Sequence, residues 1–300
     1  MKNYRIIKGY QEKEELRNSF NQLAGKTFGL DFEPWYQRGY WKDNYIPYSI
    51  LDGKKVVANV SVNPMKFKYE EEEMNVIQLG TVMTAEAYRR KGLIRRLMEE
   101  IEKDYGDTVH GFFLYANQTV TEFYPQFGYQ KSEEYEYFRE ISTSHEMRKL
   151  SQAQGVAAQK VKLQEEENRS RLETAIQNSL PQSCLWQQNN LALTMFYVDG
   201  FLSDQVYEIK SQNAFVIAEI QDKSMYLQGV FAPQKVNVEE IIAAFGEEIQ
   251  RAVLGFTPWD TAGFQVERTG SGEDTLFLKG DCLKILEKGI HLRFPVLSHT

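Results

Sequence analysis

The chain has few of the residues that build disulfide frameworks and metal centres. Its 300 residues include two cysteines, Cys184 and Cys282, and four histidines that are scattered along the sequence. Because the cysteines lie far apart and lack the spacing of metal ligands, we expect buried or free thiols rather than a disulfide framework. We also expect no bound metal.

Long hydrophobic runs are missing as well. No apolar run approaches the roughly 18 residues that a membrane span needs, and no apolar signal core follows the first residues. We therefore expect a cytoplasmic protein with no membrane partner. The net charge of −7 and the isoelectric point near 5.4 disfavour nucleic acid as a partner, because binding to a phosphate backbone requires a basic face.

Against this acidic background, one basic segment stands out. Residues 79–95 read as a strand, then a basic turn that contains Gly92, and then the start of a helix. The free N–H groups and partial positive charge of a helix start favour an anion. The cations around this turn are Arg89, Arg90, Lys91, Arg95 and Arg96. Since glycine lets the main chain approach a ligand closely, the segment predicts a site for a small polyanion.

A second motif follows, with Asn117, then Tyr124, and then Phe127, Gly128 and Tyr129. With both motifs the sequence resembles the GNAT superfamily of N-acetyltransferases, whose acetyl-CoA loop is usually written (Arg/Gln)-x-x-Gly-x-(Gly/Ala). The loop here runs Arg89, Arg90, Lys91, Gly92, Leu93 and Ile94, and Ile94 departs from that pattern. The chain looks most like the enhanced-intracellular-survival (Eis-type) branch, which has a similar basic run and a similar Tyr-x-x-Phe-Gly-Tyr motif.

This resemblance implies acetyl-CoA as the acyl donor, held where two central strands splay apart, at residues 78–84 and 112–116. The expected cofactor-binding residues are Val82, Met83 and Thr84 through their main chain, the loop residues Arg89, Arg90, Lys91, Gly92, Leu93, Ile94 and Arg95, and Asn117. Asn117 would hold the far end of the pantetheine arm. Its alternative role is to cap a helix before Thr119.

The implied reaction is direct attack of a primary amine on the thioester. By resemblance, Tyr124 is the general acid that protonates the leaving thiolate, and a phenol with a pKa near 10 is protonated at pH 7. The base stays open among Asp31, Glu33, a water molecule and the Thr300 carboxylate. The acceptor stays open among aminoglycosides, polyamines and lysine side chains.

Two other classes of function are alternatives to catalysis. A catalytically inactive CoA-binding scaffold or sensor would keep the loop without turnover. A nucleotide-binding protein would use the same basic turn, but a P-loop ends in Gly-Lys-Ser/Thr and a dinucleotide fold requires Gly-x-Gly-x-x-Gly, and this loop has neither. Antiparallel hairpins before the loop also differ from those parallel folds.

The expected elements repeat in order, which predicts an α/β (α+β) fold with two tandem GNAT-like domains, each a mixed, mostly antiparallel twisted sheet flanked by helices. We expect a catalytic domain at residues 1–145, a linker at 146–157 and a degenerate domain at 158–300, without the sterol-carrier-like domain of Eis-type proteins. In the second domain, residues 232–237 lack glycine, and Asn237 with Glu240 forms a capping-box pattern. This domain should therefore not bind CoA, but help to shape the acceptor pocket and a homo-oligomer.

Local patterns predict the elements of the first half. Two hairpins turn at Asp52-Gly53 and at residues 70–73. A helix with one apolar face runs from Gly92 to Gly106, followed by a strand at 111–116, a short helix through Tyr124 and a strand pair to Ile141. An aromatic group could form a cage for a cationic amine, or ordinary core, which is the commoner fate. Its members are Phe32, Trp35, Tyr36, Tyr40, Trp41, Tyr45 and Tyr48.

Overall fold

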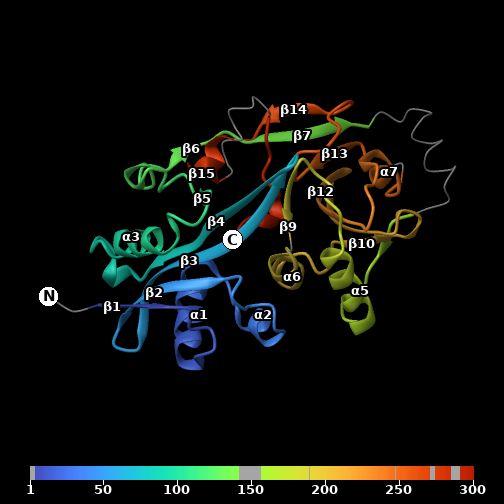
Figure 1. Cartoon of the computed structure of the whole chain (residues 1–300). Helices are drawn as coiled ribbons and strands as arrows, with labels where there is room; N and C mark the ends of the chain where they lie inside the picture. Colours follow the sequence, from blue (N-terminus) through green and yellow to red (C-terminus); the bar gives the residue numbers. More distant parts are fainter. Residues whose placement is uncertain (1–3, 142–156, 189, 247, 271–273, 285–290) are drawn as a thin grey trace.

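The fold consists of two twisted β-sheets with helices on their faces (Figure 1). This computed structural model describes residues 4–141, 157–188, 190–246, 248–270, 274–284 and 291–300. Nearly all of the predicted linker, residues 146–157, lies outside the described residues. No helix in the described ranges is both long and apolar enough to cross a membrane.

The first sheet is mixed and mostly antiparallel, in the order β1-β2-β3-β4-β5-β15-β6, and β9 also pairs with β3. Its strands are β1 (Arg5–Lys8), β2 (Ile46–Asp52), β3 (Lys55–Tyr69), β4 (Glu72–Thr84), β5 (Gly111–Ala116), β6 (Gln130–Lys131), β9 (Leu185–Gln188) and β15 (Thr275–Gly280). The hairpins β2–β3 and β3–β4 turn where the sequence predicts them. Only the β4–β5 pair is parallel, because a helix connects these two strands.

The second sheet repeats this plan, in the order β8-β10-β11-β12-β13-β7-β14 when read from β8. Its strands are β7 (Tyr135–Glu140), β8 (Gln159–Lys160), β10 (Val206–Ile209), β11 (Ala214–Gln221), β12 (Ser224–Phe231), β13 (Arg251–Leu254) and β14 (Gln265–Arg268). Here the parallel pair is β12–β13. The predicted repeat of two sheets of the same design is confirmed.

The second half contributes two strands, β9 and β15, to the first sheet, and the first half contributes one strand, β7, to the second. β15, from the second half, lies between β5 and β6 of the first sheet and pairs antiparallel with β5 from Thr275 opposite Ala116 to Gly280 opposite Gly111. β7, from the first half, lies between β13 and β14 of the second sheet. The predicted strand pair before Ile141 is therefore wrong as a pair, because β6 and β7 belong to different sheets. The domain limits 1–145 and 158–300 do not coincide with the sheets at β7, β9 and β15.

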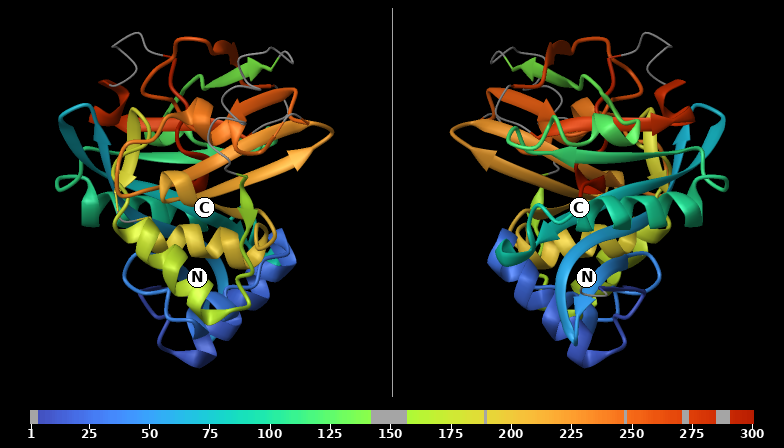
Figure 2. Two further views of the ribbon diagram at one scale, coloured as in Figure 1. Left: turned by 90° about the vertical axis from the view of Figure 1, so that its right-hand side faces the viewer. Right: turned by 90° about the vertical axis from the view of Figure 1, so that its left-hand side faces the viewer.

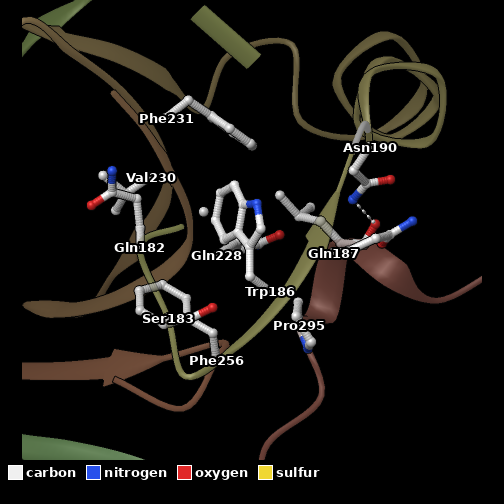
Figure 3. Close-up of a pocket in the computed structure, with 12 residues that line it drawn as sticks. Gln182, Ser183, Trp186, Gln187, Asn190, Gln228, Val230, Phe231, Phe256 and Pro295 are labelled. Carbon is white, nitrogen blue, oxygen red and sulfur yellow. Dashed lines mark hydrogen bonds between the residues drawn. The ribbon is translucent and has the colours of Figure 1, made fainter. Parts of the chain in front are cut away.

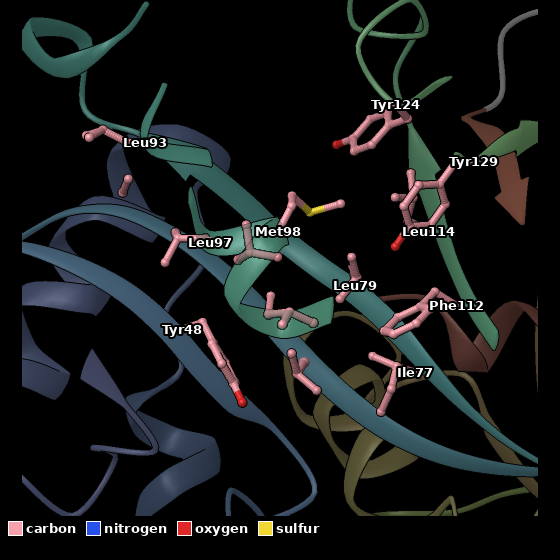
Figure 4. Packing of buried hydrophobic residues seen from close by; sticks show 14 of the residues in the cluster. Tyr48, Ile77, Leu79, Leu93, Leu97, Met98, Phe112, Leu114, Tyr124 and Tyr129 are labelled. Atoms are coloured by element: carbon pink, nitrogen blue, oxygen red, sulfur yellow. The ribbon is translucent and has the colours of Figure 1, made fainter. Parts of the chain in front are cut away.

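Helices cover both faces of the first sheet. α3 (Leu93–Tyr105) lays Leu93, Leu97, Met98 and Ile101 against one face, as its apolar spacing predicts (Figure 4). α1 (Glu14–Phe28) and α2 (Glu33–Gln37) pack on the other face. Because successive side chains of a strand point to opposite faces, Val57 joins the cluster on the α3 side, whereas Val56 packs with α1 and α2.

The second-half helices join the two sheets into one body. α5 (Glu166–Gln177) and α6 (Leu191–Gly200) cover one face of the second sheet, and α7 (Val238–Ala243) covers the other. In Figure 2 the yellow helices of the second half lie beside the blue helices of the first. At this contact the Trp35 indole donates to the Ala192 carbonyl at 2.7 Å, and the Phe196 ring stacks 5.1 Å from Phe32.

The aromatic group of the first half is core. Phe32, Trp35, Trp41, Tyr45 and Tyr48 are each no more than 3% exposed. The rings of the first four pack on one another and on Phe20. The commoner of the two predicted fates is confirmed for these five side chains, which leave no open cage for a cation, whereas Tyr36 and Tyr40 are half-buried and donate to Glu12 and Glu173.

Some local predictions are wrong. The short helix through Tyr124 is replaced by turns and a single 3-10 turn, Pro125–Phe127, which begins after Tyr124. Pro125 starts this turn because its ring presets φ and it has no N–H to donate. In the second half, the strand expected at residues 161–164 lies at Gln159–Lys160, and α7 is shorter than the predicted 237–249. β9 and α6 lie where no element was expected.

The strand exchange predicts that neither half folds well alone. Without β15, residues 1–141 would leave the edge of β5 unpaired and would expose the apolar side chains that pack on Phe277. We therefore expect this fragment to be insoluble or to melt without a cooperative transition. Co-expression with residues 157–300 should yield a soluble complex that co-purifies through a tag on either half. A fragment 1–141 that is soluble, monomeric and cooperatively folded would contradict this expectation.

Candidate active site

Two central strands of the first sheet stop pairing part of the way along their length. β4 and β5 pair from Val76 opposite Gly111 to Leu79 opposite Leu114. Beyond Leu79, β4 continues to Thr84 with β3 on one edge only, and β5 continues with β15. The facing edges then carry main-chain groups that a ligand can pair with, as an added strand would. The opening begins after Leu79 and Leu114, inside the ranges 78–84 and 112–116 that the resemblance implies but later than their first residues.

A bulge in β4 marks the start of this opening. Thr81 has a φ of +46°, and the register between β3 and β4 shifts between Asn59 and Ser61. The Thr81 carbonyl accepts a hydrogen bond from the Asn59 amide at 3.0 Å. Bulges re-aim the strand that carries them and occur next to active sites. Val82, Met83 and Thr84 follow directly, so their predicted main-chain contact with a pantetheine arm has an open edge to use.

The loop after β4 ends in an uncapped helix start. Gly92, at the N-cap of α3, has a φ of +71°, and a Cβ built there would meet no atom within 4 Å. No side chain caps α3. The first N–H groups of an α-helix, here those of Leu93, Ile94 and Arg95, have no acceptor within the helix. Such groups, with the helix dipole behind them, form a ready site for a phosphate.

The cations of this loop are not neutralised by carboxylates. Within the described ranges, none of Arg89, Arg90, Lys91, Arg95 and Arg96 forms an ion pair. Several of them bond to uncharged oxygens instead: Arg89 to the Thr84 carbonyl, Lys91 to the Ala87 carbonyl, Arg95 to the Gln126 amide and Arg96 to the Tyr4 carbonyl. A cluster of unpaired cations in an acidic chain attracts a polyanion.

Tyr124 lies on the α3 side of the opening. Its side chain is 4% exposed, packs 5.6 Å from the Phe277 ring of β15, and points its hydroxyl toward the α3 side (Figure 4). Burial, with a smaller effect of Asp274, raises the pKa of Tyr124 to about 12. The phenol is therefore protonated at neutral pH. Among the described residues its hydroxyl has no hydrogen-bond partner, which leaves the O–H free to donate to a ligand.

The other side of the opening has a different chemistry. Ile77 and Leu79 face α3, so Gln78 and Gly80 face the opposite side by strand alternation. There the Asn63 amide donates to Gln78 Oε1 at 3.2 Å and to Thr300 Oγ1 at 3.0 Å, and the Thr300 hydroxyl also bonds to Gln78. A Cβ on Gly80 would lie only 1.9 Å from Thr300 Oγ1, so glycine allows this approach.

A row of buried polar side chains leads across the sheet to this point, and sequence reasoning missed it. The Tyr10 hydroxyl bonds to Ser49, Ser49 to Asn59, and Asn59 to Ser61, at 2.6 to 2.9 Å. The signal was present in residues 59–63, where polar residues alternate with valines. In a strand buried on both faces, such alternation indicates a polar side. Gln78 Nε2 lies in this region, buried and without a partner among the described residues.

Two of the predicted bases are engaged elsewhere. Glu33 accepts hydrogen bonds from the Arg17 guanidinium at 2.8 and 3.0 Å and from Gln37, and Arg17 holds the pKa of this carboxyl below its ordinary value. The Asp31 carboxylate accepts from the Glu33 N–H at 2.9 Å at the start of α2. A carboxylate with a lowered pKa is a weaker base, so Glu33 is a poor candidate on this ground.

Asn117 follows β5 and forms a turn with its own side chain. Its Oδ1 accepts from the Thr119 N–H at 3.0 Å and from the Thr119 hydroxyl at 2.5 Å. The predicted capping contact to Thr119 is thus present, although turns rather than a helix follow it. The amide Nδ2 is a donor that remains for a ligand, and the role of Asn117 toward the pantetheine arm stays a prediction.

In the second sheet, the helix that corresponds to α3 has a side-chain cap at its start. Asn237 Oδ1 accepts from the Glu239 N–H at 2.8 Å at the start of α7, as the sequence predicts. Glu240 does not complete the capping box, because its carboxylate bonds to Gln212. One N–H group at the start of α7 is thus bonded to the capping side chain, and no basic turn precedes this helix, in contrast to α3.

Comparisons with known proteins agree with this geometry. A family model described as the acetyltransferase (GNAT) domain matches residues 10–132. A search of the curated proteins found no relative of this chain. The matched residues contain the whole of the opening, the basic loop and Tyr124.

Solved structures share the fold over nearly the whole chain. A GCN5-related N-acetyltransferase from Kribbella flavida is 15% identical with a TM-score of 0.58, covering 93% of this chain and 73% of that one. Eis1 from Mycobacterium abscessus is 12% identical with a TM-score of 0.57, covering 94% and 74%. A probable N-acyltransferase from Enterococcus faecalis is 15% identical with a TM-score of 0.55, covering 95% and 75%. At these identities the likeness shows the fold, which is that of tandem GNAT-like domains.

Gly92 supplies the first test of this site. We expect Gly92→Val to raise the Kd for CoA at least about tenfold in calorimetry, because a side chain there would block the close approach of a pyrophosphate and left-handed backbone costs a non-glycine residue about 1–2 kcal/mol. Gly53→Val is the matched control, since Gly53 has a similar φ of +64° and equally open surroundings, but lies in the β2–β3 turn. Equal CoA affinity in the two variants would contradict the assignment of the loop.

Proposed function

We propose that the chain moves an acetyl group from acetyl-CoA to a primary amine, because residues 10–132 match the model of the GNAT acetyltransferase domain. The observation that carries the proposal is the opening between β4 and β5, which leads to an uncapped helix start surrounded by unpaired cations. The pantetheine arm would pair with the open edge of β4 at Val82, Met83 and Thr84. The phosphates would bind the loop from Arg89 to Arg95.

Tyr124 is the proposed general acid. The reaction expels a CoA thiolate from a tetrahedral intermediate, and a buried, protonated phenol can donate a hydrogen bond and then its proton to that sulfur. The absence of a hydrogen-bond partner among the described residues supports this role, because the hydroxyl need not break an existing bond to serve the thiolate. Burial also strengthens the interaction by excluding water.

The Thr300 carboxylate is the proposed base. In this chain Thr300 lies against Gly80, on the side of the opening that faces away from Tyr124. An ammonium acceptor must lose a proton before it attacks, and a carboxylate beside the attack site can take it directly or through a water molecule. Glu33 is tied to Arg17, and Asp31 is tied to the start of α2, which favours Thr300 over both.

The polar side of the opening supports an amine acceptor. Asn63, Gln78 and Thr300 form a hydrogen-bonded polar cluster on this side, in which the Gln78 and Thr300 side-chain oxygens are acceptors of the kind that an incoming ammonium needs. The acceptor would enter from the side of α1, α2 and α6, and the cofactor from the side of α3. Acid and base then act on opposite faces of one sheet, which places the tetrahedral carbon between them.

A free-thiol assay with acetyl-CoA tests this function. The acceptor panel contains aminoglycosides, polyamines and lysine-containing peptides, and CoA titration calorimetry is run on the same sample. We expect amine-dependent thiol release with one of these classes. Tight CoA binding without release across the panel would favour a CoA-binding scaffold, and failure to bind CoA at all would favour another phosphorylated ligand.

Replacing Tyr124 tests the general acid. Tyr124→Phe should lower kcat roughly 100-fold, within the range that general acids contribute, and leave the Kd for CoA nearly unchanged. Tyr129→Phe is the matched control, because Tyr129 is equally buried in the same cluster, 6.3 Å from the Tyr124 ring. The assignment is wrong if CoA affinity falls as much as turnover, or if Tyr129→Phe loses as much activity.

Extending the chain tests the base. One glycine added after Thr300 moves the carboxylate by about 3.5 Å along the chain. We expect kcat to fall at least about tenfold and to lose its acidic limb in the pH profile, since a general base must be within hydrogen-bond reach of its proton. Thr300→Ser is the control, because it keeps both the hydroxyl and the carboxylate. If kcat is unchanged in the extended chain, the general base is Asp31 or a water molecule.

A further inference from the structure

The second sheet has an opening of the same kind as the first. β12 and β13 run parallel and pair from Ser224 opposite Arg251 to Leu227 opposite Leu254, and then stop. β12 continues to Phe231 with β11. The place corresponds to the opening between β4 and β5, where the GNAT fold of the first half has its candidate cofactor site. Its basic loop and free helix start are missing here, so another occupant has to be identified.

A segment of the chain itself occupies this second opening. Trp186, Pro295 and Leu297 line it together with the ends of β12 and β13 (Figure 3). The Val296 N–H donates to the Gly255 carbonyl at 2.9 Å, so residue 296 bonds to the main chain just after β13 as an added strand would. The remaining space is about 30 Å³, which holds little more than a water molecule, against the several hundred cubic ångströms of a ligand pocket.

Two glycines at this opening are explained by the segment they face. A Cβ on Gly255 would lie 2.6 Å from Val296 Cγ2, and a Cβ on Gly229 would lie 2.8 Å from Leu297 Cδ1. Neither glycine has the positive φ that other residues avoid. Their backbone conformation would therefore accept alanine, and the closest atoms that oppose a side chain belong to residues 296 and 297, ahead of Leu227 and Gln228 main-chain atoms and the Phe231 ring at 3.3 Å.

From this opening the segment runs on to the first sheet. Asn190 of the second half donates to the Leu297 carbonyl at 3.0 Å (Figure 3), and the Tyr197 hydroxyl donates to the His299 carbonyl at 2.7 Å. The His299 ring lies 3.7 Å from that of Tyr115 on β5. Thr300 then lies against Gly80 on β4. Residues 296 to 300 thus connect the opening of one sheet to that of the other.

We infer that the opening between β12 and β13 is a socket for residues 295–298 of this same chain, and that seating them there sets the position of Thr300 beside Gly80. The second half then acts on the candidate active site through a segment that it holds, and Gly229 and Gly255 are positioning residues. The catalytic part of this inference rests on the proposed function of Thr300, whereas the socket itself does not.

The test is a steric exchange between Gly255 and Val296. Gly255→Ala puts a methyl group where Val296 Cγ2 lies, and Val296→Ala in the same chain removes that methyl. Gly200→Ala is the control, because no atom lies within 4 Å of a Cβ built on Gly200. Hydrogen–deuterium exchange of residues 294–300 reports whether the segment is seated. CoA titration and amine-dependent thiol release on the same samples report on the candidate active site.

In Gly255→Ala we expect residues 294–300 to exchange at least about tenfold faster, and kcat to fall about tenfold with the Kd for CoA within twofold of wild type. The double variant should exchange within about threefold of the wild-type rate and recover most of kcat. Should Gly255→Ala fail to fold, Gly229→Ala takes its place, with Leu297→Ala as its partner, because the clashing Leu297 atom is the end of a flexible side chain.

The socket is contradicted if residues 294–300 of folded Gly255→Ala exchange at the wild-type rate. It is also contradicted if these residues exchange as fast in the double variant as in Gly255→Ala alone. Faster exchange with unchanged kcat would overturn the positioning of Thr300 for catalysis. If no variant releases thiol but hydrogen–deuterium exchange changes as expected, the socket is supported and the proposed acetyl transfer is wrong. The outcomes for the socket and for the function are therefore separate.

Discussion

The insertion of β15 between β5 and β6 is the contact on which the rest of the molecule depends. Its main-chain ladder with β5 gives that strand a partner on the edge away from the opening, so β5 can leave β4 after Leu114 without losing its hydrogen bonds on both sides. Phe277 of β15 also packs against Tyr124. A strand from the second half thereby supports both the shape of the opening and the side chain of its candidate acid.

The same exchange forces the two halves to share a core. Because β7 lies in the second sheet whereas β9 and β15 lie in the first, the chain crosses between the sheets four times along the described strands, and α6, which follows β9, packs on α2. Proteins with two loosely joined domains can move as separate bodies, but a sheet completed by the other half ties their folding together. This arrangement also brings residues 296–300 of the second half to the polar side of the first sheet.

Charge and polarity divide the opening in a way that follows from strand alternation. Apolar residues of β4 face α3, with Tyr124 beyond them, whereas Gln78 and Gly80 face the buried polar row and Thr300. The unpaired cations of the loop after β4 lie at its mouth. The basic loop and the polar side of the opening therefore lie on different sides of β4, so the proposed cofactor and acceptor would approach separately.

The sequence by itself determined the local features. Turn residues, apolar spacing and the glycine of the basic loop are short-range signals, so the hairpins of β2, β3 and β4, the face of α3 and the repeated order of elements were predictable. The position of the opening, by contrast, was implied by the resemblance to the GNAT superfamily and not by a local signal. The alternating polar residues 59–63 were readable too, although their meaning depends on knowing that the strand is buried on both faces.

Only the tertiary structure decided which strands share a sheet and what fills each opening. The residue patterns of β15 and β7 are those of any buried strand. Main-chain N–H and C=O groups are the same in nearly every residue, so the local sequence does not indicate which strand pairs with which. The same is true of Thr300, which lies beside Gly80, a residue far from it in the chain, because residues 295–298 seat between β12 and β13. Such contacts depend on shape and packing across hundreds of residues, and local propensity does not encode them.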